Sequence, residues 1–264
     1  MEAAFKRIAL LLALWPAAAM AEGAPPSIWQ DYAAEGWRLI DSASGDLNRD
    51  RIDDAVAAIE APEGVTEPAN SCSAEKDTSD APVRRLIVAF ADGNGRFTRM
   101  ADEPRVLLRA DEGGAMGDPE QGVFVERGSI VLMFFGGSRS RWSQTLRFRF
   151  DDSDWRMSGA TETQIDSVYN SIIQYDYNAL TGKVQVTVEE SPDAEAAVEE
   201  PLCVACRVGE TCPDANGCHA GTRRAGAGTT WFDVGRKERV RLSDYRCWED
   251  ATGLLVHTGF QSQR

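Results

Sequence analysis

The feature that most constrains the fold is a two-residue alternation of apolar and polar side chains along the middle of the chain. In residues 146–150 a leucine and two phenylalanines alternate with arginines, and in residues 184–188 three valines alternate with polar residues. Successive side chains of a β-strand point to opposite faces, so this pattern predicts strands with one buried face. Ser129 to Phe135 is apolar after its first residue, which predicts a central strand buried on both faces.

Turn residues separate these segments. Asp92 to Gly95, Arg127-Gly128 and Thr181-Gly182 all supply residues that accept the positive φ of tight turns. No segment shows a sustained helical period. We therefore predict an all-β domain, built mainly of antiparallel hairpins and shaped like a sandwich or an open barrel, with a cysteine-rich C-terminal tail.

The N-terminal residues predict export. Lys6 and Arg7 precede an apolar run from Ile8 to Leu14, and Ala19 to Ala21 forms a small-residue cleavage site. We expect a signal peptide over residues 1–21, cleaved near Ala21, and a periplasmic or secreted protein. No later stretch approaches the roughly 20 apolar residues that a transmembrane helix needs, so no membrane span is expected.

Charge excludes some partners. The chain carries a formal charge of −14, which argues against nucleic acid and anionic membrane surfaces. Only His219 and His257 are present, which argues against histidine-based catalysis. The remaining candidates for a partner are a protein or a glycan of the cell envelope.

The cysteines lie mostly in the tail. We expect a β-rich domain over residues 22–190, followed over residues 191–264 by an acidic linker and a disulfide-rich tail. Six cysteines in an exported chain favour disulfides but allow fifteen pairings, and a zinc site around Cys203 and Cys206 stays open as the weaker alternative. The six are Cys72, Cys203, Cys206, Cys212, Cys218 and Cys247.

An acidic loop between two apolar segments is the clearest candidate site. Residues 46–54 read Asp-Leu-Asn-Arg-Asp-Arg-Ile-Asp-Asp, with oxygen-bearing side chains at positions one, three, five and nine. Calcium takes six to eight oxygen ligands, so a loop of this kind predicts one calcium site. The alternative is a metal-free polar turn held by side-chain hydrogen bonds. The expected ligands are the side chains of Asp46, Asn48, Asp50 and Asp54 and the carbonyl of Ile52.

This loop and its flanks resemble the calcium loop of FG-GAP and VCBS-type β repeats. More widely, residues 31–190, with residues 231–242 as a last element, resemble a family of exported bacterial proteins of uncharacterised function that carry a single such loop. The resemblance implies a β fold and a calcium ion but no activity. It rests, besides the loop, on Gly36-Trp37, Arg85 to Val88, Gly113-Gly114, Gly117 to Pro119, Gly136 to Ser138, Arg141-Trp142, Phe148 to Phe150 and Leu180 to Lys183.

One position departs from the loops that this one resembles, and another excludes an EF-hand. The sixth position, usually glycine because the backbone bends sharply there, is Arg51, and a non-glycine residue at positive φ costs roughly 1 kcal/mol. Ala57 stands where an EF-hand would have its twelfth-position glutamate. A single loop also excludes a propeller, because its blades need repetition.

A weaker candidate surface follows the central strand. Arg139 and Arg141 suit a carboxylate, and Trp142 suits a sugar or aromatic ring; alternatively the tryptophan packs on the core. The abundant carboxylates leave open a glycan hydrolase that uses a carboxylate pair. We expect a binding or interaction module with one structural calcium ion, and the envelope-glycan hydrolase is the alternative.

Overall fold

The computed structural model describes residues 27–65, 81–167 and 171–190 and, in the tail, 202–203, 206–207, 224–225, 228–233, 235–236, 238–246 and 254–255. The expected signal peptide and the pairing of the cysteine side chains lie outside these residues. Among the described helices, none is long and apolar enough to cross a membrane.

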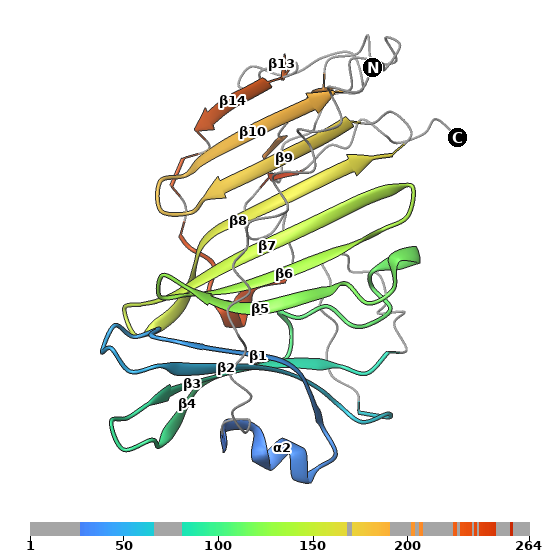
Figure 1. Ribbon diagram of the computed structural model, residues 1–264. Coiled ribbons are helices and arrows are strands. Elements are labelled where there is room, and N and C mark those ends of the chain that lie inside the picture. The colour runs from blue at the N-terminus through green and yellow to red at the C-terminus, as the bar shows by residue number, and fades with distance from the viewer. Residues whose placement is uncertain are drawn as a thin grey trace, which may run out of the picture.

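A four-stranded antiparallel sheet forms one end of the molecule (Figure 1). Its strands follow sequence order: β1 (Arg38–Gly45), β2 (Asp54–Glu60), β3 (Arg84–Ala91) and β4 (Phe97–Glu103). Every residue of β2 is buried, because neighbours cover both of its faces. Each strand pairs with its neighbour along the chain, so the expected hairpins are confirmed.

A seven-stranded antiparallel sheet forms the rest, in the order β14-β10-β9-β8-β7-β6-β5 (Figure 1). The tail strand β14 pairs with β10, so a segment beyond residue 190 completes this sheet. The strands are β5 (Glu120–Glu126), β6 (Ser129–Gly137), β7 (Ser140–Asp151), β8 (Asp154–Asp166), β9 (Ser171–Asn178), β10 (Lys183–Glu190) and β14 (Gly228–Asp233). The fold is therefore all-β and antiparallel, as the sequence predicts.

Short elements surround the two sheets. At the N-terminal end, η1 (Ser27–Trp29) and α2 (Gln30–Ala34) precede β1, and η2 (Gly114–Met116) precedes β5. In the tail, β11 (Leu202–Cys203) pairs with β13 (Arg224–Ala225), and β12 (Cys206–Arg207) pairs with β15 (Leu254–Leu255). Residues 231–242, the last element of the resemblance, cover the end of β14 and reach η3 (Leu242–Asp244), a short 3-10 helix.

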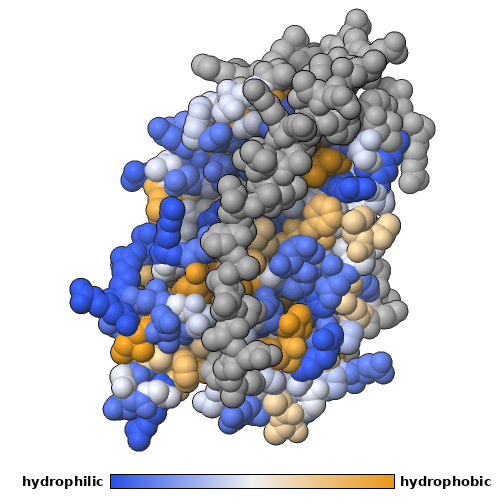
Figure 2. Space-filling model, viewed as in Figure 1, coloured by the Kyte–Doolittle hydropathy of each residue, from blue (hydrophilic) through white to orange (hydrophobic). Residues whose placement is uncertain are grey.

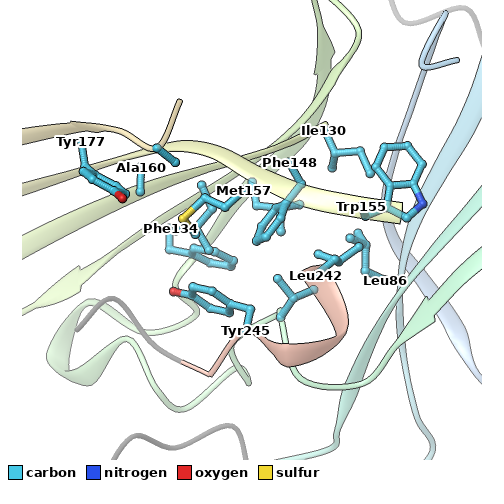
Figure 3. Close-up of a cluster of buried hydrophobic side chains, with 14 of the residues drawn as sticks. Leu86, Ile130, Phe134, Phe148, Trp155, Met157, Ala160, Tyr177, Leu242 and Tyr245 are labelled. Atoms are coloured by element: carbon cyan, nitrogen blue, oxygen red, sulfur yellow. The ribbon is translucent and has the colours of Figure 1, made fainter. Parts of the chain in front are cut away.

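The main core lies between the two sheets and is closed by the tail (Figure 3). Phe148 of β7 meets Tyr245 edge to face, with ring centroids 5.9 Å apart. Leu86 of β3 and Leu242 of η3 belong to the same cluster. The residues after β14 thus bury side chains against both sheets.

A second core lies on the opposite face of the small sheet. Trp37, just before β1, is buried there with Ile28 of η1 and Ile59 of β2. Tyr32 of α2 packs on Trp37 edge to face, with ring centroids 5.1 Å apart. The N-terminal helices therefore cover this face.

Candidate functional site

The acidic loop joins β1 to β2 at one edge of the small sheet. The hairpin closes at the pair Gly45 and Asp54, and residues 46–53 span the turn. Leu47 points inward and is 1% exposed, so it anchors the loop in the main core. The polar side chains of the turn accept hydrogen bonds from the backbone that follows Leu47.

Asp46 holds the turn together from within. One of its carboxylate oxygens accepts the backbone N–H groups of Arg49 at 2.6 Å and Asp50 at 3.1 Å, and the other accepts that of Arg51 at 3.0 Å. A carboxylate that accepts several backbone N–H groups replaces the water these groups would otherwise bind. Asp46 therefore shapes the loop through these backbone hydrogen bonds.

Asn48 and Asp50 form a second set of local hydrogen bonds. The Asn48 Oδ1 accepts the Asp50 N–H at 2.9 Å, and the Asn48 side-chain amide donates to Asp50 Oδ2 at 3.0 Å. Asp50 Oδ1 also accepts the Ile52 N–H at 2.8 Å. The structure thus brings Asp46, Asn48 and Asp50 together at the tip of the hairpin.

Asp54 faces the other way. It is fully buried, and its Oδ2 accepts the N–H groups of Leu47 at 2.8 Å and Asn48 at 3.2 Å. Its Oδ1 accepts the N–H of Ala91, at the end of β3, at 2.9 Å. Burial raises the pKa of Asp54, while the backbone N–H groups of Ala91, Leu47 and Asn48 oppose that rise. Asp54 ties the loop to the neighbouring strand.

The backbone of the loop is bent where a glycine is usual. Arg51 has φ of 72° and Arg49 has φ of 69°, both in the left-handed region. Side chains other than glycine pay roughly 1–2 kcal/mol for this conformation. The sharp bend expected at the sixth position is therefore present, although the residue there is an arginine.

The loop keeps some capacity for a cation. A carboxylate offers about four acceptor positions, and Asp46 uses three of them while Asp50 uses two. Asp54 does not converge with these two side chains, because its oxygens face Leu47, Asn48 and Ala91. Within the described part of the chain, no group of three or more His, Cys, Asp or Glu side chains is arranged to hold a metal. Of the five expected ligands, Asp46, Asn48 and Asp50 lie together at the tip of the hairpin, and Asp54 does not join them.

The second candidate surface is divided by the strand geometry. Arg141 and Trp142 are consecutive residues of β7, so their side chains point to opposite faces. Trp142 is partly buried against the main core, and it lies so close to Gly136 that a Cβ there would come within 2.5 Å of the ring. The Arg139 side chain lies 3.8 Å from Asp166. Trp142 thus packs as a core residue, and the three side chains do not share one face.

Two carboxyls outside the loop bear on the hydrolase alternative. Burial raises the pKa of Glu103 to about 7, with Asp102 and Asp244 adding to the effect. Burial also raises the pKa of Glu120 to about 7. The Oε2 atom of Glu120 is buried, which closes it to a glycosidic oxygen. A general acid has to reach the bond it protonates, so Glu120 does not supply one.

A buried arginine is the main polar feature that the sequence analysis missed. Arg84 is 1% exposed, and its guanidinium bonds Glu60 at 3.0 Å, Asp118 at 2.8 Å and the Leu108 carbonyl at 3.1 Å. The hydrogen bond from Arg84 lowers the pKa of Asp118. Alternation along β3 places Arg84 on the same face as Leu86, and this signal could have identified it.

Comparison with known proteins adds no family to this description. No family model matches the chain, and no curated protein matches it. Any function has to be inferred from the residues themselves.

Proposed function

We propose that the protein is an exported β-rich binding or interaction module whose acidic loop takes one structural calcium ion. Its partner is a protein or glycan of the cell envelope. The observation that carries the binding role is an exposed tryptophan on a regular strand. Trp231 of β14 is 60% exposed, the largest exposure of any large hydrophobic side chain among the described residues.

Polar side chains extend from this tryptophan across the large sheet. Directly paired residues of antiparallel strands share a face, and Trp231 pairs with Gln185, which pairs with Asp176, which pairs with Thr161. Thr161 donates a hydrogen bond to Asp176 at 2.8 Å. An aromatic anchor beside hydrogen-bonding groups is typical of a recognition surface.

The surface composition supports a recognition role. On the described part of the face in Figure 2, hydrophobic residues form separate patches among hydrophilic ones. Interfaces that form and dissociate are about as apolar as the rest of a protein surface, with aromatic residues enriched. A mixed surface fits this description, and Trp231 is the exposed tryptophan among the described residues.

The calcium assignment rests on the tip of the acidic loop. Asp46, Asn48 and Asp50 already lie together there, and Arg49 and Arg51 already have the positive φ of a tight turn. An ion would add a positive charge at a turn that carries the carboxylates of Asp46 and Asp50. Binding to the folded state alone adds about 2.7 kcal/mol of stability at 100 times the dissociation constant.

Calorimetry with calcium chloride on the purified, oxidised chain tests the calcium proposal. We expect saturable binding with one site, and a rise in melting temperature that Asp50→Ala removes. Asp53→Asn is the matched control, because this exposed neighbour is not a proposed ligand and its loss changes the local charge equally. Absence of binding up to several millimolar calcium, or equal losses in the two variants, would show that the loop is a polar turn.

A separate experiment tests the recognition surface. Envelope components retained by the immobilised wild-type chain are compared with those retained by Trp231→Ala and by Met100→Ala, another exposed apolar side chain on a different sheet. We expect loss of a retained component only with Trp231→Ala. Retention that is identical for all three proteins would contradict a binding role for this face.

A further inference from the structure

The two sheets meet edge to edge along β1 and β5, and a carboxylate bridges the contact. Asp41 of β1 accepts the backbone N–H of Val123 of β5 on its Oδ2 at 2.7 Å. Its Oδ1 accepts the N–H of Ser42 at 2.8 Å. Edge strands carry unpaired backbone groups, and here a side chain satisfies one of them.

Both edges are irregular at this point. The register of β1 shifts between Leu39 and Asp41, and that of β5 shifts between Glu120 and Gly122. Such bulges bend a strand and redirect a side chain. Gly122 has φ of 139°, and a Cβ on it would lie 3.5 Å from the Asp41 carboxylate. The two bulges thus bring acidic side chains into the contact between the sheets.

Glu120 is the second acidic side chain in this contact. Its Oε1 accepts the N–H of Gly122 at 3.1 Å, and its buried Oε2 has no hydrogen-bond partner among the described residues. The charged groups that act on it are Asp41 on β1, Asp118 just ahead of β5 and Arg84 on β3. Arg84 already bonds Asp118, so Glu120 has no cation of its own.

We propose that Glu120 holds a proton at the contact between the two sheets, and that release of this proton loosens the contact. A buried carboxylate with one oxygen unpartnered and no cation of its own is costly, whereas the neutral acid is tolerated. The ionised form also places a second negative charge beside Asp41, which bridges the sheets. The contact is therefore a pH-sensitive joint, and it does not depend on calcium.

The direction of the pH effect follows from the folded-state pKa. Burial raises the pKa of Glu120 from 4.5 to about 7, and Asp41 and Asp118 add to the rise while Gly122 and Arg84 oppose it. The folded state therefore keeps a proton that the unfolded state loses. This contribution to stability is complete below pH 4.5 and is lost as the pH rises to about 7. The unfolding equilibrium constant increases by up to about 300-fold over this range.

Carbon-detected NMR on the wild-type chain labelled at glutamate tests the proton directly. We expect the Glu120 carboxyl to titrate with a midpoint near 7 and the protection of the Val123 amide against hydrogen exchange to fall over the same range. Asp41→Asn keeps an acceptor for Val123 but removes a charge, so it should lower the midpoint. A wild-type midpoint below 5, or one unaffected by Asp41→Asn, would overturn the proposal.

Unfolding at two pH values tests the consequence. Glu120→Gln keeps an acceptor for Gly122 and cannot ionise, so its unfolding constant should change at least tenfold less between pH 5 and pH 8 than that of the wild type. Glu126→Gln is the matched control, because Glu126 is an exposed residue of the same strand. A pH dependence of Glu120→Gln equal to that of the wild type would refute the joint, and the NMR titration decides the matter if this variant does not fold.

Discussion

Replacement of Asp54 by alanine tests whether the acidic loop is primarily a structural tie. The substitution removes the acceptor for three backbone N–H groups, of which those of Leu47 and Ala91 are buried and that of Asn48 is partly buried. Each buried donor left without a partner costs roughly 1–3 kcal/mol, which gives about 2–6 kcal/mol for the two buried groups.

Part of this loss is offset because the wild-type carboxylate is itself costly to bury. Its raised pKa, caused first by desolvation, reports that cost. Allowing on the order of 1–3 kcal/mol for its removal, we expect Asp54→Ala to lower the free energy of unfolding by about 2 kcal/mol. Asp54→Asn should lower the free energy of unfolding by less than Asp54→Ala. Its side-chain carbonyl can still accept the N–H groups of Leu47 and Asn48, although its amide group faces the Ala91 N–H.

Urea denaturation measures the effect as a shift in midpoint at constant slope. Asp53→Ala is the control, since Asp53 is adjacent but exposed, and it should change stability by less than about 0.5 kcal/mol. If Asp54→Ala and Asp53→Ala lose the same stability, the hydrogen bonds of Asp54 do not hold the loop. If Asp54→Ala is stabilising, the cost of burying the carboxylate exceeds the free energy of its three hydrogen bonds.

Three further substitutions test other parts of the fold. Arg51→Gly should raise stability by up to about 1 kcal/mol in a thermal melt, because it relieves the strain of a φ of 72°. The greater backbone entropy of glycine in the unfolded chain offsets part of that gain. Arg84→Leu should lower the free energy of unfolding in urea by about 3–5 kcal/mol, because it leaves the buried Glu60 carboxylate without its buried partner. Gly136→Ala should cost about 1–3 kcal/mol in urea, because its Cβ would come within 2.5 Å of the Trp142 ring.

Control variants test whether the stability changes of Arg51→Gly and Gly136→Ala come from the local geometry and not from introducing or removing a glycine. Arg96→Gly introduces a glycine in the β3–β4 turn at a residue without positive φ, and it should not be stabilising. Gly93→Ala adds a Cβ that meets only Ile52, at 4.0 Å, and it should be close to neutral. A stabilising Arg96→Gly or a costly Gly93→Ala would contradict the local explanations. For Arg84, preserved stability in Arg84→Leu would show that Glu60 is satisfied by other groups.

The hairpins are the part of the fold that the sequence could predict. Alternation over residues 146–150 and 184–188 placed alternate side chains in the core, and Leu146, Phe148 and all three valines of β10 are buried. Turn chemistry was equally informative, since Arg127 and Gly128 both have positive φ. These signals are local, because strand period and turn conformation depend on neighbouring residues.

The acidic loop was predictable in its conformation but not in the role of each carboxylate. Sequence spacing suggested that Asp46 and Asp54 act alike, as ligands of one ion. In the structure Asp46 organises the turn, while Asp54 is buried and accepts an N–H from Ala91, 37 residues away. The sequence of the loop alone does not predict that Ala91 is the donor.

Non-local pairing decided what the sequence could not. Alternation indicated a strand but not that β14 would return from the tail to join β10. Nor did it indicate that β1 and β5 would meet where the charge of Asp41 acts on Glu120. The strand period of a sequence fixes which way a side chain points. Only the packing of distant strands fixes whether a charge there meets water, an arginine or another carboxylate, and that environment sets its chemistry.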